Sequence, residues 1–477
     1  MEEFHSFYYD QMQREPVTSD FTVPVGTVLT PELLQEIIDD NEDNHLPRYQ
    51  WLDAAYNTKY KIFDPTKAKA DYKADNRLAA DMAYDITETF EGYFIGNPIQ
   101  LRSDKQDFLD EYEERNFQED VNADLSKMCS KFGHAYEMLY QDDDGLPRSV
   151  ALTPRLSFMV YDDSVLHRPL WFVRYSYDED GHLKGSYSDS QNVVPFSDEE
   201  GTLLFGEPQS HYFGAVPAIE YKQNTEKRGL YEGVLNLIEA YNKVLSEKAN
   251  DVDYFADSYM VVTGQELPDD FKKDLKEYRL INLFGGSDED GASVQVEFLA
   301  KPNGDTTQEN LIDRLEMLIF KMAMVPDITD ESFSTASGIA LKMRLLPMSN
   351  MAKNKERKFK RAIKERLRLL ANYPNQNFSG DDWMKVEITM QRNMPEDLAS
   401  EASIAGSLSG IVSEETQLSV LSVVDDPEKE IERKQEEQNK KNDSLSDRMP
   451  LNRTKEETDE TDRTVQRQEE AERTRIA

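Results

Sequence analysis

The chain has 477 residues, with 93 Asp and Glu against 55 Lys and Arg, and its formal charge is −38. At about 150 residues per domain, this length allows roughly three domains and excludes a peptide or a disulfide-stapled mini-protein. The acidic excess argues against a protein that grips duplex DNA over its whole surface. Cys129 is the single cysteine and cannot form an internal disulfide, so we expect a reducing compartment such as the cytoplasm.

No segment is expected to enter a membrane. The first residues, Met1-Glu2-Glu3, are acidic where a signal peptide would be basic, and the most apolar long stretch, 315–325, is short and interrupted by Lys321. Six histidines and one cysteine give no pattern with zinc spacing, so no metal and no cofactor are expected.

The first part of the chain is expected to be mostly helical after an irregular arm, residues 1–30, that lies on or reaches to a neighbour. Thr30-Pro31 offers a capping side chain followed by proline at the first helical position, which predicts the start of a helix. Further helical patterning covers 75–92, 103–115 and 117–140.

Residues 148–222 have the texture of short β-strands. The expected strands are apolar or β-branched runs at 149–153, 157–161, 170–175 and 216–221. Two acidic turns, 142–145 and 178–181, lack the alternating ligands and the closing Glu of an EF-hand. They predict hairpin turns rather than calcium loops.

Two long amphipathic helices follow, and they predict a two-helix stalk. The first has its apolar stripe at Leu230, Val234, Leu237, Ile238, Tyr241, Val244 and Leu245, and the second at Leu311, Leu315, Leu318, Ile319, Met322 and Val325. Between them we expect a short helix over 268–278 and a hairpin that pairs 279–284 with 293–299.

A Ser- and Thr-rich loop, 327–338, precedes a further helix over about 339–372, which Pro347 should kink. Residues 342–368 hold eleven Lys and Arg against Glu356 and Glu365, a net charge of +9 in an acidic chain. These cations either pair with acidic neighbours from adjacent helices or subunits, or face a phosphate backbone without reading its sequence. The candidate residues are Lys342, Arg344, Lys353, Lys355, Arg357, Lys358, Lys360 and Arg361.

The last segment, 425–477, is almost free of apolar residues, and 29 of its 53 positions are charged. It is expected to be disordered, or helical only on oligomerisation.

The sequence gives no sign of an enzyme. Phosphate-binding, dinucleotide-binding, zinc-protease and nucleophile-elbow motifs are all missing. His134 is expected at the end of a helix near Cys129, and we interpret the two as packing rather than as a base and its nucleophile. Acidic pairs such as Asp142–Asp144 or Asp288–Asp290 lack a third ligand for a nuclease metal.

Four groups of residues, taken in chain order, resemble the portal proteins of long-tailed bacteriophages. They are Asn76-Arg-Leu-Ala with Gly92-Tyr-Phe-Ile-Gly-Asn-Pro98, Gly133-His-Ala-Tyr-Glu-Met-Leu-Tyr140 with Tyr161-Asp-Asp163, Val216-Pro217 through Leu237-Ile-Glu-Ala-Tyr-Asn242 to Asn250-Asp251, and Ser337-Gly-Ile-Ala-Leu-Lys342 through Lys355-Glu-Arg357. The resemblance covers roughly residues 50–370. It is weak after about 373 and over 259–304.

This resemblance implies an α+β, mainly α, portal fold in a ring, usually of twelve subunits, at one capsid vertex. By position the implied parts are an N-terminal arm (1–30), a β-rich wing (31–228), two stem helices (229–258 and 305–325), a small α/β clip (259–304), a tunnel loop (326–338), a kinked helix with a helical crown (339–424) and a charged tail (425–477).

The resemblance also implies partners and a location. Double-stranded DNA would pass through the channel, and the implied protein partners are the terminase large subunit, the scaffolding and major capsid proteins and a head-completion adaptor. The protein would lie in the virion, and in the host cytoplasm during assembly. The candidate tunnel-loop residues are Asp327, Asp330, Glu331, Ser332, Ser334, Thr335, Ser337 and Gly338, and the candidate clip residues are Asp269, Lys272, Lys273 and Lys276.

One feature departs from what a DNA-gripping loop needs. The loop 327–338 has three carboxylates and no Lys or Arg before Lys342, so any DNA contact there would rest on Ser, Thr and backbone groups. Two other classes stay open from the residues alone. One is an acidic helical scaffolding or adaptor protein without a DNA conduit, and the other is a metal-dependent nuclease.

Overall fold

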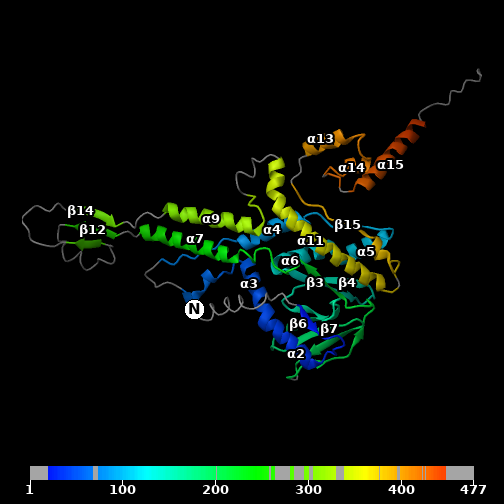
Figure 1. The fold of residues 1–477 in the computed structure, drawn as a ribbon, viewed down its shortest axis with the longest axis horizontal. Helices are drawn as coiled ribbons and strands as arrows, with labels where there is room; N and C mark the ends of the chain where they lie inside the picture. The colour runs from blue at the N-terminus through cyan, green and yellow to red at the C-terminus, as the bar shows by residue number, and fades with distance from the viewer. Residues whose placement is uncertain are drawn as a thin grey trace, which may run out of the picture. The chain divides into compact units, whose positions relative to one another are not determined.

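The computed structural model describes residues 20–67, 74–199, 201–256, 259–263, 280–283, 295–299, 305–328, 338–374, 376–394, 398–421, 423–424 and 426–446. The chain divides into two compact units, Met1–Asn393 and Met394–Ala477. About half of the described residues are helical and the rest include several sheets, as expected for a mainly helical α+β protein (Figure 1).

The first unit opens with helices, as expected, but the helix predicted over 75–92 begins only at Met82, and the helix over 46–56 was not assigned from the sequence. The helices are α2 (Pro31–Asp40), α3 (Leu46–Tyr56), α4 (Met82–Ile95), α5 (Gln106–Asn116) and α6 (Gln118–Phe132), with a π-helical turn, η1 (Asn41–His45), between α2 and α3. Thr30 caps α2 as expected, because its hydroxyl accepts the backbone N–H of Leu33 at 3.3 Å. The sequence placed a helix over 117–140, and this was wrong beyond Phe132. Gly133, at φ +90°, ends α6 in the left-handed conformation, and the chain continues as a strand.

A large sheet forms one side of this unit. Its strand order is β1-β5-β6-β7-β8-β10, with β9 also paired to β8. The strands are β1 (Phe21–Val23), β5 (Ser157–Asp162), β6 (Pro169–Tyr177), β7 (Leu183–Ser188), β8 (Asn192–Ser197), β9 (Leu204–Phe205) and β10 (Gln209–Ser210). The sequence reading missed β7 to β10. Residues 20–23, which belong to the expected N-terminal arm, pack against their own chain, because their strand β1 pairs in parallel with β5.

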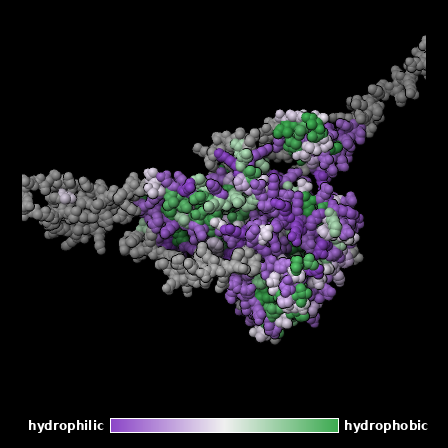
Figure 2. All heavy atoms as spheres, viewed as in Figure 1, coloured by the Kyte–Doolittle hydropathy of each residue, from purple (hydrophilic) through white to green (hydrophobic). Residues whose placement is uncertain are grey.

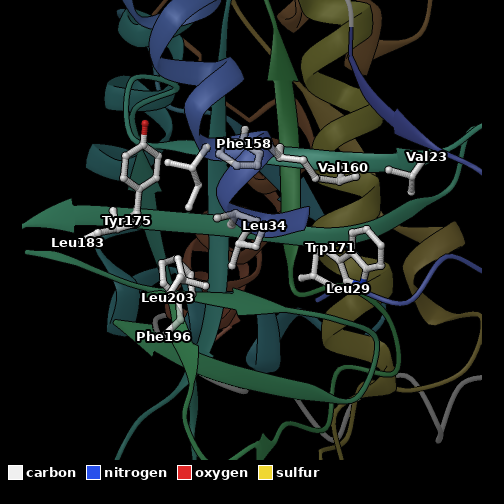
Figure 3. Close-up of a cluster of buried hydrophobic side chains, with 13 residues drawn as sticks. Val23, Leu29, Leu34, Phe158, Val160, Trp171, Tyr175, Leu183, Phe196 and Leu203 are labelled. Carbon is white, nitrogen blue, oxygen red and sulfur yellow. The ribbon is translucent and has the colours of Figure 1, made fainter. Parts of the chain in front are cut away.

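The core of the sheet is a cluster of buried apolar side chains between its strands and α2 (Figure 3). Leu34 of α2 lies among strand residues such as Phe158 and Trp171 (Figure 3), and Ile37 and Ile38 of α2 belong to the same buried cluster. These three α2 positions are one helical turn apart or adjacent, and so share one face of the helix.

A second sheet has the order β11-β3-β4, from β3 (His134–Gln141), β4 (Pro147–Leu152) and β11 (Ala218–Lys222). Both acidic turns are hairpin turns, as predicted. Asp142 and Asp178 each accept two backbone N–H groups of their own turn, and Gly145 and Gly181 supply the positive φ.

The predicted stalk consists of α7 (Leu235–Ala256) and α9 (Asp305–Ala323), which lie side by side (Figure 1). Residues 229–234 form turns rather than the first helical turn. At the far end is a three-stranded sheet of β12 (Tyr259–Thr263), β13 (Leu280–Leu283) and β14 (Gln295–Leu299).

The expected hairpin between 279–284 and 293–299 was wrong. β12 lies between these two strands, parallel to β13 and antiparallel to β14. The run Tyr-Met-Val-Val-Thr of β12 has the β-branched composition of a central strand, and this run was not identified from the sequence. The expected helix over 268–278 and the clip residues Asp269, Lys272, Lys273 and Lys276 lie outside the described residues.

The long basic helix is α11 (Gly338–Asn372), with Pro347 inside it. Proline has no N–H to give to the carbonyl of Met343, and the helix axis changes direction near this end of α11 in Figure 1, as predicted. A short helix, α12 (Asp382–Lys385), and a strand, β15 (Glu387–Thr389), follow, and β15 pairs with β2 (Gln100–Arg102).

The second unit contains α13 (Leu398–Leu408), α14 (Glu414–Leu418) and α15 (Pro427–Ser446). The expectation of disorder from residue 425 is not met over Pro427–Ser446, which is helical within this single chain. Ion pairs along its surface, Glu430–Arg433 and Glu436–Lys440, and the pair of Lys434 with Glu414 of α14 favour the helix. Residues 447–477 lie outside the described residues. Among the helices that the structure describes, none is long and apolar enough to cross a bilayer.

Candidate functional site: the stem and the basic helix

The cations predicted on α11 fall into two groups with different surroundings. Lys355 is fully buried, Lys358 and Lys360 are half-buried, and the other candidates are exposed. Counting 100° per residue around the helix, Lys353, Arg357 and Arg361 lie on one face, and Lys355 lies on the opposite face together with Phe359. The basic helix therefore has an inward cation and an outward basic stripe.

Lys355 is held in a closed polar pocket between α11, α4 and α6. Its ammonium donates to Glu91 Oε1 at 2.7 Å, to the Ser126 carbonyl at 3.0 Å and to Ser130 Oγ at 2.9 Å. The rings of Phe90, Phe94 and Phe359 surround it, with centroids 4.7 to 5.5 Å away. Burial lowers the pKa of Lys355, and the Glu91 carboxylate opposes this shift.

A second buried ion pair lies further along α11. Arg366 Nη1 donates to Glu137 Oε1 of β3 at 3.2 Å and to Asn122 Oδ1 of α6 at 2.9 Å. The hydroxyl of Tyr221 donates to Glu137 Oε2 at 2.8 Å. Burial is the largest influence and disfavours the charged guanidinium, but Glu137 together with Tyr221, Tyr112 and Glu113 outweighs it, so the pKa of Arg366 is raised.

The sequence reading counted Arg366 among the eleven cations but did not single it out. The position of Arg366 in the sequence nevertheless indicated that it would be buried, because it falls on the apolar stripe of α11 with Phe359, Ala362 and Ile363. For Lys355 and Arg366 the structure supports the first interpretation of the basic run, pairing with acidic neighbours on adjacent elements. Both residues are excluded from contact with DNA or with another subunit, because Lys355 is 0% and Arg366 1% exposed.

The outward stripe has different neighbours. In the part of the chain that the structure describes, Lys353, Arg357 and Arg361 form no ion pair with a carboxylate, and Arg357 bonds only to the Lys353 carbonyl and Asn354. Lys360 differs, since it pairs with Glu356 at 2.8 Å, and Glu356 also pairs with Arg392.

Helix α7 holds an extended segment, residues 76–80, through a row of three polar side chains. Asn250 Oδ1 accepts the N–H of Asn76 at 2.6 Å, Ser246 Oγ accepts that of Leu78 at 2.9 Å, and Asn242 Oδ1 accepts that of Ala80 at 2.9 Å. Four residues of helix rise about 6.0 Å and two residues of extended chain about 6.6 Å, so the two repeats match. Asn76, Asn242 and Asn250 belong to motifs that carried the resemblance, and the fold brings them together.

The outer surface of the stem carries apolar side chains. Leu311, Met317, Met322 and Met324 of the α9 segment are each about half exposed, and Met343 of α11 is 68% exposed. Figure 2 shows hydrophobic residues gathered over this part of the molecule. A chain that works alone in water rarely exposes such a contiguous set.

The start of the predicted tunnel loop lies against the first turns of the basic helix. Asp327, Glu316 and Met317 line one groove together with Arg344 and Pro347. Burial and the charge of Asp327 raise the pKa of Glu316. Gly338 is the first residue of α11, and the other candidates, Asp330, Glu331, Ser332, Ser334, Thr335 and Ser337, lie outside the described residues.

His134 and Cys129 do not form a catalytic pair. His134 is the first residue of β3, two residues after the end of α6, with Nε2 2.7 Å from the Tyr49 hydroxyl and Nδ1 2.8 Å from Glu220 Oε1. Burial lowers the pKa of His134 to about 4, so the neutral ring donates from Nδ1 and accepts at Nε2. Both nitrogens are thus occupied, and burial raises the pKa of the Cys129 thiol. The packing interpretation is confirmed.

Metal ligation finds no support in the part of the molecule that is described. Among those residues no group of three or more His, Cys, Asp or Glu side chains is placed to hold a metal ion. Asp142 accepts hydrogen bonds within its turn and from Arg148, at 2.8 Å. The pair Asp288–Asp290 lies outside the described residues.

Comparisons with known proteins agree with one another. The family model described as phage portal protein, SPP1 Gp6-like, matches residues 35–444. The portal protein of Bacillus phage SPP1 is 24% identical over 447 residues, covering 85% of this chain and 86% of that protein. The portal protein of Clostridium phage phiCD119 is 23% identical over 204 residues, covering 42% and 44% of the two chains.

Solved structures with a similar chain include the neck of the native GTA particle computed with C12 symmetry. It is 10% identical, with a TM-score of 0.43, and covers 78% of this chain and 93% of the other. The virion of the native gene transfer agent particle gives 10% identity and a TM-score of 0.42, with 78% and 92% coverage.

Proposed function

The chain belongs to the phage portal protein family of the SPP1 Gp6-like type, and from this membership we propose that it assembles into a closed ring, of twelve copies in the virion, through which DNA is packaged and ejected. Members of this family are structural components of the assembly and not enzymes. The same membership displaces the scaffolding or adaptor alternative and the nuclease alternative.

The observation that carries the ring is the exposed apolar surface of the stem. Met317 is half exposed on the face of α9 opposite the buried Ile312, Leu315 and Ile319. Leu311 and Met322 are also about half exposed, beside this buried stripe. One chain cannot cover both faces of the helix. A neighbouring copy covers the outer face, and a head-to-tail contact of this kind closes into a ring when its rotation divides the circle.

The charge of the chain supports a conduit through which DNA slides. With a net charge of −38 per copy, a channel lined by this protein repels phosphates and holds DNA in no deep binding well. Contact with double-stranded DNA would be independent of its sequence, since no base-reading motif is present. The tunnel loop, 326–338, and the outward cations of α11 are the candidate contacts.

The sheet of β12, β13 and β14 is the proposed docking site for the terminase motor and, later, for the head-completion adaptor. It is inserted between the two stem helices, so it projects beyond the ends of α7 and α9. The scaffolding and major capsid proteins are the proposed partners of the ring at the capsid vertex. Deleting 264–298 should leave rings intact and abolish packaging, and retained packaging would refute the clip assignment.

The ring is tested by placing a charge on the outer face of the stem. Met317→Glu and Met322→Glu should shift the purified chain from rings to small species in light scattering, because each contact recurs in every copy. Met384, exposed to 58% on α12, gives the matched control Met384→Glu, which should assemble normally. Normal rings in both stem variants would show that this surface is not the subunit interface.

A further inference from the structure

A groove with an unusual rim lies at the corner between α5 and α6. Its apolar lining comes from Ile95 at the end of α4, from Pro98 and Ile99 just after it, and from Phe117 and Ala123 at the corner. Phe117 is 78% exposed although it is aromatic. It belongs to neither apolar cluster of the two sheets.

The backbone conformation at Phe117 does not favour a bulky side chain, so the fold alone does not explain why an aromatic residue is exposed here. Phe117 has φ 47° and ψ 47°, the left-handed conformation that Gly or Asn adopts more readily than a bulky residue. It ends α5, and its N–H donates to the Glu114 carbonyl at 3.3 Å, which any residue with an N–H could do. The chain therefore keeps a ring in solvent at a position where a smaller residue would fit better.

The rim of the groove is acidic. Glu113 and Glu114 end α5, Glu119 and Asp120 begin α6, and all four line the groove. Among the described residues none of these four carboxylates forms an ion pair. Burial, the largest influence, raises the pKa of Glu113 to about 7, although the charge of the buried Arg366 opposes this shift.

The outward stripe of α11 has the opposite character. Lys353, Arg357 and Arg361 are exposed and without a carboxylate partner among the described residues, and they span about 12 Å along the helix. The stripe points away from Lys355, which faces α4 and α6 on the other side of the helix. One chain thus carries two complementary patches, on different elements, that do not satisfy each other.

We propose that the stripe Lys353–Arg357–Arg361 of one copy docks on the rim of the α5–α6 groove of the next copy, with the Phe117 ring packed against the aliphatic stems of these side chains. Two different patches that fit each other make a heterologous contact, which is what a ring requires. Long cationic side chains suit such a site, because their stems cover apolar surface while their ends meet carboxylates. This inference rests on the proposed ring and names one of its contacts.

A charge-reversal pair tests the proposal with the full-length chain. The variant Lys353→Glu/Arg357→Glu/Arg361→Glu, and separately Glu113→Lys/Glu114→Lys/Glu119→Lys, should each raise the protein concentration needed for half-assembly by about tenfold or more. Combining the two sets should restore assembly at least in part. A control with the same charge change at exposed sites elsewhere, Lys59→Glu/Arg174→Glu/Lys429→Glu, should assemble like the wild type.

The position of Phe117 offers a second test that does not change charge. Phe117→Asn removes the ring and relaxes the backbone, so thermal unfolding of the unassembled chain should be unchanged or slightly higher while assembly weakens about tenfold. Unchanged assembly in this variant and in both reversed sets would overturn the proposal, even though wild-type rings still form.

Two further outcomes have a definite meaning. If the reversed stripe leaves rings intact but DNA retention fails, the stripe faces DNA and the proposal is wrong. If the wild-type chain forms no ring under any condition, the proposed function is wrong. Assembly of the wild type is therefore measured before any variant is compared with it.

Discussion

Lys355 and Glu91, 264 residues apart in the chain, form a buried ion pair with 2.7 Å between Nζ and Oε1. Their side chains are 0% and 6% exposed. The pair joins α11 to α4 on the far side of Pro347 from the tunnel loop. It therefore fixes the part of α11 that follows Pro347 on α4, while Arg344 and Pro347 line the groove with Glu316 and Asp327.

Removing one partner of this pair should be costly. Lys355→Met leaves the Glu91 carboxylate buried without its cation, so we expect a loss of about 3–5 kcal/mol in the free energy of unfolding of the first unit. The double variant Lys355→Met/Glu91→Leu should lose less than the sum of the two single variants. Denaturant unfolding followed by tryptophan fluorescence measures both, and additive effects would contradict a coupled pair.

The polar row on α7 should control the order of the segment that it holds. Ser246→Ala removes the acceptor for the Leu78 N–H, and we expect a loss of about 1 kcal/mol together with faster hydrogen exchange at Asn76, Leu78 and Ala80. Lys243→Ala, an exposed change on the same helix, is the control and should leave exchange at these amides unchanged. Equal protection in Ser246→Ala would mean that the row does not hold the segment.

The buried histidines predict a pH dependence of stability. Burial lowers the pKa of both His45 and His134 to about 4, from about 6.5 in an unfolded chain. Between these values the unfolded chain binds more protons, so stability should rise with pH from about 4 to 6.5. Each histidine contributes on the order of 3 kcal/mol across this window.

Thermal unfolding measured from pH 4.5 to 7 checks the sign. His45→Gln should flatten the profile, and a profile as steep as that of the wild type would exclude His45 as a source.

Glu220 affects stability in a different pH range. Its burial opposes ionisation, but Lys227 and His134 lower its pKa, so its contribution is lost only below about 4.5.

Gly133 should tolerate no side chain. At φ +90° a Cβ would lie 1.8 Å from the Lys227 carbonyl oxygen, so Gly133→Ala must displace the backbone of residues 227–228 and should cost about 3 kcal/mol or more. Gly181 has a similar φ of +85° with nothing within 4 Å of its Cβ position. Gly181→Ala should cost only about 1 kcal/mol, and equal losses in the two variants would rule out the close approach as the cause.

The sequence predicted those features that depend on residues close together in the chain. The 3.6-residue apolar period identified both stem helices and α11, and Thr30 and Pro347 marked a cap and a kink through chemistry within one turn. The strand β3 was taken for a continuation of the preceding helix, because its mixture of apolar and polar residues gives no clear alternation and Gly133 alone marks the change. The central place of β12 could not be predicted, because strand order depends on contacts distant in sequence.

The candidate site shows the same limit. All eleven cations of the basic run look alike in composition, yet Lys355 and Arg366 are structural and Lys353, Arg357 and Arg361 are not paired in this way. Helical position separates them, since the first two share the face of Phe359. Reversing Lys353, Lys355, Arg357, Lys358 and Lys360 together would therefore unfold the chain rather than report on assembly. The carboxylate partners Glu91 and Glu137, more than 220 residues away, had no local signal.

The central claim is that this chain closes into a ring. End-on electron microscopy images of the purified full-length protein test it most directly, together with the mass of the assembly in solution. We expect closed rings with a central opening and a mass that is a whole-number multiple of 55.1 kDa, with the multiple near twelve. Monomers at every protein and salt concentration, or open chains without a channel, would contradict it.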